Sequence, residues 1–125
     1  MQIKHRMQME VGKKYYVAGS YMDDPSKAQV EVITYKGITT HLITGGDVLL
    51  FLGEDDRKGH HYDQDVGIGP RPHNFRRVYS RQDEAQEYCN RLVAGNFTPE
   101  EKDLMDHHEA FLAMLDLESQ VYPDD

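Results

Sequence analysis

The sequence predicts an α+β domain, with a small antiparallel β-sheet or partly open barrel in its N-terminal half and two α-helices at its C-terminal end. Short β-branched and aromatic runs, separated by glycine and proline turns, fill residues 1–79. Apolar residues at helical spacing, with helix-start signals before them, fill residues 80–120. A chain of 125 residues is one domain by length, so we expect residues 1–125 to form a single unit.

The first strands are predicted from alternation and from turn residues. Lys13 to Ala18 is a short aromatic run between two glycines, and Ala28 to Tyr35 alternates between two faces. Lys36-Gly37 favours a tight turn, which would return Ile38 to Ile43 as a hairpin partner.

The later strands are predicted from composition. Val48 to Leu52 is the most apolar run and is typical of a central, fully buried strand. His60 to Ile68 fits a polar strand or a loop. Gly69 to Pro72 holds two prolines, which exclude a central strand. Phe75 to Tyr79 is expected to be the last strand.

Two helices follow. Ser80 is the expected N-cap of the first, and Gly95-Asn96 is its expected end. Five residues of this helix share one apolar face: Ala85, Tyr88, Cys89, Leu92 and Val93. Thr98-Pro99-Glu100-Glu101 has the spacing of a capping box with a proline at the first helical position, so the second helix should begin there and run to about Ser119.

The apolar residues of the second helix spread over about half of its circumference, which is wide for a surface helix. They are Leu104, Met105, Phe111, Leu112, Met114 and Leu115. This arc indicates either deep burial between sheet and first helix or contact with another copy of the chain. A homo-oligomer formed through the C-terminal helix is therefore one expected partner.

Charge is distributed unevenly along the chain. The net charge of −8 divides into −2 for residues 1–56, +4 for residues 57–81 and −10 for residues 82–125. The basic stretch Arg71 to Arg81 also carries aromatic and amide side chains. Arginine binds phosphate bidentately and aromatic rings stack on bases, so this stretch is the candidate ligand site.

Each candidate ligand-binding residue has an expected role. Arg71, Arg76 and Arg77 would hold phosphates, with Arg57 and Lys58 adding positive charge from the preceding connection. Phe75 or Tyr79 would stack, and His73 or Asn74 would read polar groups. Ser80, at a helix N-terminus, is a further expected phosphate position. The alternative is that these arginines only neutralise the acidic helices.

The charge pattern favours a small phosphate-bearing ligand over long nucleic acid, because a chain of net charge −8 repels a polyanion. It also permits a different class of function. The acidic helices fit a protein inhibitor, anti-CRISPR-like, that docks on the basic site of a nucleic-acid-binding partner.

No catalytic apparatus is recognisable, and we expect neither a cofactor nor an enzyme. The serines lack a nucleophile elbow, and Cys89 lies on an apolar helix face. A metal-dependent hydrolase is an alternative, because His61, Asp63 and Asp65 would share one face if they lie on a strand. The chain shows neither a secretory signal nor an apolar run of ~18 residues, so no membrane association and a cytoplasmic location are expected.

The order of elements and the chain length resemble those of the phage-encoded Thoeris anti-defence proteins, which sequester cyclic ADP-ribose signals. The resemblance covers most of the chain but includes no signature motif, so it assigns no binding residues. It implies a viral, oligomeric protein that acts in the host cytoplasm and binds a nucleotide signal without turning it over.

Overall fold

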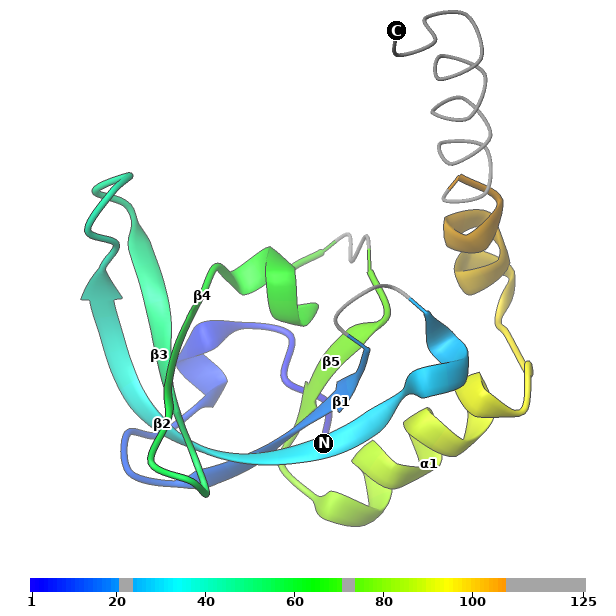
Figure 1. The fold of residues 1–125 in the computed structure, drawn as a ribbon, viewed down its shortest axis with the longest axis horizontal. Coiled ribbons are helices and arrows are strands. Elements are labelled where there is room, and N and C mark those ends of the chain that lie inside the picture. The colour runs from blue at the N-terminus through cyan, green and yellow to red at the C-terminus, as the bar shows by residue number, and fades with distance from the viewer. Residues whose placement is uncertain (21–23, 71–73, 108–125) are drawn as a thin grey trace, which may run out of the picture.

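Five antiparallel strands form a strongly curved, open sheet with a helix packed against its outer face (Figure 1). The computed structural model describes residues 1–20, 24–70 and 74–107. The strand order is β4-β3-β2-β1-β5, so β4 and β5 are the two edges. The strands are β1 (Lys14–Gly19), β2 (Gln29–Thr40), β3 (Asp47–Gly53), β4 (Lys58–His61) and β5 (Arg76–Tyr79). The predicted α+β layout is confirmed, with an open sheet as its β portion.

Strand β2 is continuous where a hairpin was expected. It pairs with β1 through its first half and with β3 through its second half. Gly37 has a φ of +97° and lies at the register shift between Tyr35 and Ile38, so it forms a bulge within the strand. The chain reverses later, where the backbone N–H of His41 donates to the carbonyl of Gly46 at 2.8 Å. The predicted turn at Lys36-Gly37 is therefore wrong.

Two further strand predictions need correction. Strand β3 is second from the edge, and β2 is central, because the chain after β4 returns to pair with β1. Strand β4 ends at His61, and the next residues form the 3₁₀ helix η3 (Asp63–Val66). His61, Asp63 and Asp65 therefore do not share a strand face.

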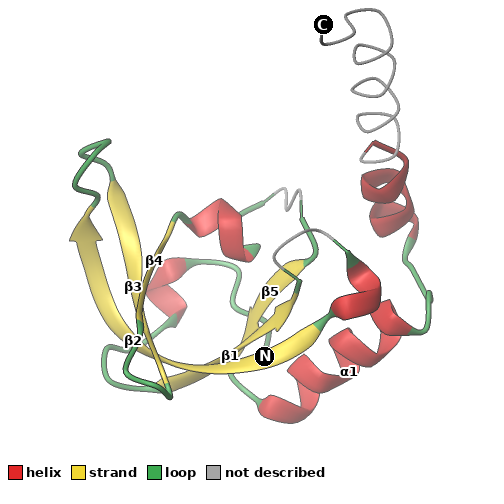
Figure 2. Ribbon diagram, in the orientation of Figure 1, coloured by secondary structure: helices red, strands yellow, loops and turns green. Residues whose placement is uncertain are grey.

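The sheet buries a different core on each face. The inner core lies in the hollow of the sheet, which the 3₁₀ helices η1 (Arg6–Gln8) and η3 face (Figure 2). It contains Ile3, Met9, Tyr15, Val17, Ile33, Tyr35, Leu49, Phe51, Val66, Ile68 and Val78. The outer core lies beneath helix α1 (Gln82–Val93) and contains Ala18, Phe75, Ala85, Tyr88, Cys89 and Leu92.

Helix α1 begins one residue later than the capping pattern predicts. Its N-cap is Arg81, because the Ser80 hydroxyl is hydrogen-bonded to Met1, whose terminal ammonium group donates to it at 3.0 Å. The N-terminal residues run along β5, and the backbone N–H of Ser80 donates to the Met1 carbonyl at 2.9 Å. Four of the five predicted apolar positions of α1 are buried, whereas Val93 is 53% exposed.

The second helix begins as its sequence predicts. The Thr98 hydroxyl accepts a bond from the Glu101 backbone N–H at 3.2 Å, and the Glu101 carboxylate accepts one from the Thr98 N–H at 2.9 Å, which completes the capping box. Residues 99–107 are helical. Leu104 and Met105 pack against the outer core. The rest of the predicted apolar arc and the predicted end near Ser119 lie outside the described residues.

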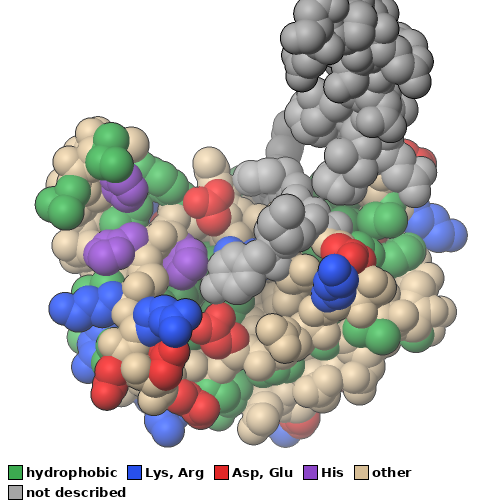
Figure 3. Space-filling model, viewed as in Figure 1, with side chains coloured by type: hydrophobic (Ala, Val, Ile, Leu, Met, Phe, Trp, Pro, Cys, Tyr) green, Lys and Arg blue, Asp and Glu red, His purple; other side chains and the backbone are tan. Residues whose placement is uncertain are grey.

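The most exposed large apolar side chains among the described residues lie in the β2–β3 hairpin. Leu42 and Ile43 are 101% and 90% exposed at the tip of the β2–β3 hairpin, where Figure 3 shows hydrophobic side chains. Within the described ranges, no helix combines the length and the apolar character that crossing a membrane requires.

Candidate functional site

Strand β5 divides the predicted basic cluster between the two faces of the sheet. Phe75, Arg77 and Tyr79 face the outer core under α1, whereas Arg76 and Val78 face the hollow, as alternation along a strand requires. Adjacent arginines therefore line different pockets. The structure does not bring the predicted binding residues into one site.

Two of the predicted residues have structural roles. Asn74 uses its side-chain amide to donate to the carbonyls of Gln64 and Asp65, at 3.1 and 3.0 Å, and its Oδ1 accepts from the Arg76 backbone N–H. Phe75 is 1% exposed and packs against Phe97. Asn74 thus ties η3 to β5, and the Phe75 ring is part of the core instead of an exposed stacking surface. Arg71 and His73 lie outside the described residues.

The first pocket, here called the concave pocket, lies in the hollow of the sheet and has a volume of about 150 Å³. Its floor is apolar and consists of Val17, Ile33 and Phe51. Its rim carries Arg57, Lys58, Arg76, His61 and Glu31. The expected meeting of Arg57 and Lys58 with an arginine of the basic stretch therefore occurs here, with Arg76.

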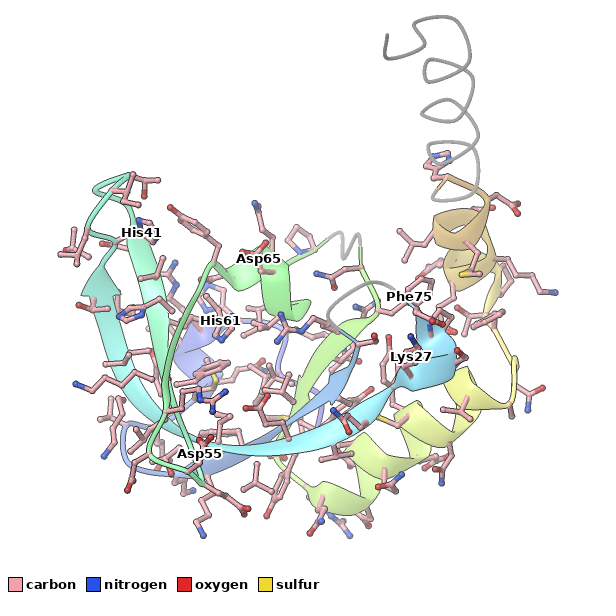
Figure 4. The ribbon with its side chains drawn as sticks, in the orientation of Figure 1. Lys27, His41, Asp55, His61, Asp65 and Phe75 are labelled. Atoms are coloured by element: carbon pink, nitrogen blue, oxygen red, sulfur yellow. The ribbon has the colours of Figure 1, made fainter. Side chains whose placement is uncertain are left out.

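The imidazole of His61 is held neutral in this pocket. It lies 5.3 Å from the Phe51 ring, centroid to centroid, and points into the hollow from β4 (Figure 4). Burial lowers its pKa to about 4, and the positive charge of Arg76 adds to that effect.

The second pocket, here called the junction pocket, has a volume of about 610 Å³ and lies where the N-terminal segment, β5, α1 and the second helix meet. Arg77 and Tyr79 line it, together with Tyr88 and Arg91 of α1. Its lining also includes the charged residues Lys4, Glu100 and Glu101, and His5. It contains two of the predicted binding residues and adjoins Pro70.

Tyr88 is the unusual residue of the junction pocket. Two guanidinium groups lie over its ring, with the Arg77 and Arg91 Cζ atoms 5.7 and 5.4 Å from the ring centroid. The side chain is 6% exposed, and its hydroxyl is the one fully buried side-chain polar atom among the described residues that lacks a hydrogen-bond partner. Burial raises the pKa of this phenol and raises that of neighbouring Tyr79 to about 12, so both are protonated donors at neutral pH.

The two arginines of the junction pocket differ in their partners. Arg91 forms a bidentate ion pair with Glu101, whose side chain is 6% exposed. Arg77 donates through Nη1 to the carbonyls of Asn74 and Arg76, at 2.8 and 2.6 Å, and no carboxylate of the described residues pairs with it. The positive charge of Arg77 acts both on the Glu101 carboxylate, whose pKa it helps to lower, and on the Tyr88 phenol, whose pKa it lowers against the larger effect of burial.

The sequence pattern places Tyr88 only in the apolar core, and neither Arg91 nor Glu101 is among the predicted ligand-binding residues. The i, i+3 spacing of Tyr88 and Arg91 puts them on one side of α1 and was an available signal. The Arg91–Glu101 pair was not predictable, because it depends on how the two helices meet.

The predicted phosphate position at Ser80 is occupied by the chain itself. The Met1 ammonium group contacts both the Ser80 hydroxyl and the Glu84 carboxylate. An anion at this helix start would have to displace that contact and would meet Glu84.

The described residues provide no support for the metal alternative. Asp63 is bound to Arg6 by two hydrogen bonds, of 2.9 and 3.0 Å. No group of three histidine, cysteine or acidic side chains in that part of the chain is placed to hold one ion. Cys89 is buried, which raises the pKa of its thiol and suits packing better than nucleophilic chemistry.

Comparison with known proteins found no matching family model, no matching curated protein and no matching solved structure.

Proposed function

We propose that this chain is a non-enzymatic binding protein that sequesters a small phosphate-bearing ligand, such as a nucleotide signal, in the junction pocket. The observation behind the proposal is the buried Tyr88 hydroxyl, which has no hydrogen-bond partner among the described residues and whose ring lies close to the guanidinium groups of Arg77 and Arg91. A buried donor without an acceptor costs free energy in the free protein, and a phosphate oxygen would satisfy it.

The size and chemistry of the pocket support a nucleotide-sized ligand. Its volume of about 610 Å³ lies inside the usual range for small-molecule sites, roughly 300–1,000 Å³. Arg77 would meet the phosphate, and Tyr79 would offer its ring to a base. Cys89, the one cysteine of the chain, does not line the pocket, so the proposal needs no covalent step at a thiol.

The two glutamates of the junction pocket set the expected electrostatics. Glu101 is neutralised by Arg91, whereas Glu100 is exposed and forms no ion pair with another described residue. The pocket lining has three basic residues, Lys4, Arg77 and Arg91, and two acidic ones, Glu100 and Glu101. The lining therefore carries one net positive charge, although the whole chain has a net charge of −8. Glu100 should therefore weaken phosphate binding, and its removal should strengthen it.

The test is native mass spectrometry of the protein mixed with a panel of linear and cyclic nucleotides. We expect one ligand per subunit, recovered chemically unchanged after denaturation. Glu100→Gln should tighten binding about two- to fivefold, whereas Glu87→Gln, the same change at an exposed site on α1 outside the pocket, should have a much smaller effect. A hydrolysed product would exclude sequestration, and equal responses of the two variants would exclude this site.

The exposed acidic residues of the helices favour a second candidate, an inhibitor that docks on a basic site of a partner protein. They are Asp83, Glu87, Glu100, Asp103 and Asp106, all on α1 or the second helix. Salt-sensitive co-purification with a nucleic-acid-binding protein, without any nucleotide binding, would support this candidate and contradict the first.

If nucleotide binding is found, the resemblance to the Thoeris anti-defence proteins suggests a role. The protein would then lower the concentration of a host immune signal, and an oligomer built through the C-terminal helix would multiply its binding sites. Signal depletion in cell extract, measured with and without Arg77→Gln protein that is verified as folded, tests this role.

A further inference from the structure

We propose that the concave pocket is a second anion site, separate from the junction pocket, that binds a compact phosphate: inorganic phosphate or the end of a phosphomonoester. Its position on the opposite face of β5 makes it independent of the ligand proposed above. Its charged rim, its size and its apolar floor favour this ligand class.

The rim concentrates positive charge from the β3–β4 hairpin and from β5. Arg57 and Lys58 come from the β3–β4 hairpin, and Arg76 comes from β5. Glu31 is the single carboxylate among the lining residues. The three basic side chains and Glu31 together carry two net positive charges, and His61 adds none because its pKa is lowered. Asp55 forms an exposed pair with Arg57 at 3.3 Å, a contact that contributes little in water.

Arg76 is held in position before any anion arrives. Its residue is 9% exposed, its backbone N–H donates to Asn74 Oδ1, and its Nη1 donates to the Asp65 carbonyl at 3.4 Å. A buried, oriented guanidinium binds an anion with little loss of side-chain entropy. The exposed Arg57 and Lys58 can then close over the bound group.

The size of the pocket selects the ligand class. A volume of about 150 Å³ is well below the roughly 300 Å³ at which sites for larger molecules begin, but it accommodates a phosphate group. Gly59 contributes to this space: a Cβ atom there would lie 2.7 Å from His61 Nε2. The buried floor of Val17, Ile33 and Phe51 offers an apolar contact that would favour the ester end of a phosphomonoester.

The test is calorimetric titration at pH 7 and low ionic strength with two probes, inorganic phosphate and phenyl phosphate. We expect one saturable site for both. Lys58→Gln should weaken binding about three- to tenfold, and Glu31→Gln should strengthen it. The matched control is Lys36→Gln, the same charge change at an exposed position of β2 outside the pocket, which should change affinity by less than about twofold.

The two probes distinguish the source of the phosphate. Tighter binding of phenyl phosphate assigns the site to a phosphomonoester, and equal binding assigns it to free phosphate. The absence of saturation, or equal weakening by Lys58→Gln and Lys36→Gln, would overturn the proposal.

A second readout reports directly from the pocket. The groups around His61 are Arg76 from β5, Asp65 from η3, His60 from its own strand and the ring of Phe51. An anion bound among them should raise the pKa of His61 above about 4, which proton NMR detects, with the His41 resonances at the hairpin tip as the reference. Gly59→Ala keeps every charge but displaces the imidazole, and should weaken this response.

Failure here and failure of the proposed function are distinguishable. Lys58→Gln should leave nucleotide binding at the junction pocket unchanged, and Glu100→Gln should leave binding of inorganic phosphate unchanged. A variant that alters both to the same extent would show one shared site and would contradict the separation by β5.

Discussion

Replacement of Tyr88 by phenylalanine separates the stability of this protein from its proposed binding function. The hydroxyl is buried and has no hydrogen-bond partner among the described residues, while the ring contacts the guanidinium groups of Arg77 and Arg91. Tyr88→Phe removes only the hydroxyl. It should therefore stabilise the free protein and weaken its complex with ligand.

The magnitudes follow from the cost of a buried unpaired donor. That cost is roughly 1–3 kcal/mol, and we take the lower end because the neighbouring guanidinium groups keep the site polar, so the free energy of unfolding should rise by about 1 kcal/mol. For a chain of this length the same change raises Tm by roughly 3–5 °C. A lost hydrogen bond to a phosphate oxygen is worth about 1.5 kcal/mol, so ligand affinity should fall about tenfold.

The matched control is Tyr15→Phe. Tyr15 is 4% exposed, close to the 6% of Tyr88, but its hydroxyl accepts a hydrogen bond from the Glu10 backbone N–H at 2.7 Å. Its removal should lower the free energy of unfolding by about 1 kcal/mol. Urea unfolding of the wild type and both variants measures the pair. If Tyr88→Phe destabilises the protein as much as Tyr15→Phe does, the Tyr88 hydroxyl is satisfied in the free protein and our reasoning is wrong.

Three further changes test other parts of the structure. Burial alone would raise the pKa of Glu101, but hydrogen bonds from Arg91 and the Thr98 N–H lower it. The contribution of Glu101 to stability is therefore present above pH 4.5 and is lost as pH falls through the lowered pKa. Glu101→Gln should lower the free energy of unfolding in urea by about 2 kcal/mol at pH 7, and the variant should lose less stability than the wild type on acidification. Burial lowers the pKa of His61 from 6.5 to about 4, so the folded state takes up this proton less readily than the unfolded state. The free energy of unfolding should therefore fall by about 1–2 kcal/mol between pH 6.5 and pH 4, a figure reduced for the partial exposure of the ring. His61→Gln should remove that part of the pH dependence, and an unchanged profile would contradict the assignment. Gly19 has a φ of +128°, and a Cβ atom there would lie 1.8 Å from the Phe75 carbonyl oxygen. Gly19→Ala should therefore lower the free energy of unfolding, measured by circular dichroism melting, by more than about 3 kcal/mol. Gly12 has a φ of +90° and open space around it, so Gly12→Ala should lower the same quantity by about 1 kcal/mol.

The parts of the fold that follow from local pattern were predictable. The alternation of the first part of β2, the capping box at Thr98 and the buried face of α1 each depend on residues close together in the sequence. The failures are tertiary. Gly37 satisfies either a turn or a bulge, and only the pairing of β2 with two neighbours decides for the bulge. Ser80 has the hydroxyl that an N-cap needs, but this hydroxyl is bound by Met1 of the N-terminal segment, which runs along β5.

The candidate site was predictable as a composition and not as a geometry. The sequence locates the arginines of β5 and the support of Arg57 and Lys58, but alternation then sends Arg76 and Arg77 to opposite faces. The amide of Asn74 and the ring of Phe75 were taken for ligand contacts because both residues are chemically suited to binding. The fold needs them for hydrogen bonding to backbone carbonyls and for packing.

The partners of Arg77 bear on the choice between ligand binding, as we propose, and simple neutralisation of the acidic helices. Neutralisation predicts that the arginines of β5 pair with carboxylates of the helices. Glu101, the buried carboxylate of the second helix, pairs instead with Arg91 of α1, and Arg77 is held by backbone carbonyls, which carry no net charge. Arg77 forms no ion pair with a carboxylate of the described residues; its other neighbours are the Tyr88 ring and Asn74 Oδ1, and its charge also acts on Glu101. The net charge of −8 therefore does not describe the local field at the junction pocket, where a surplus positive charge lies beneath the acidic helices and an anionic ligand would complete its pairing.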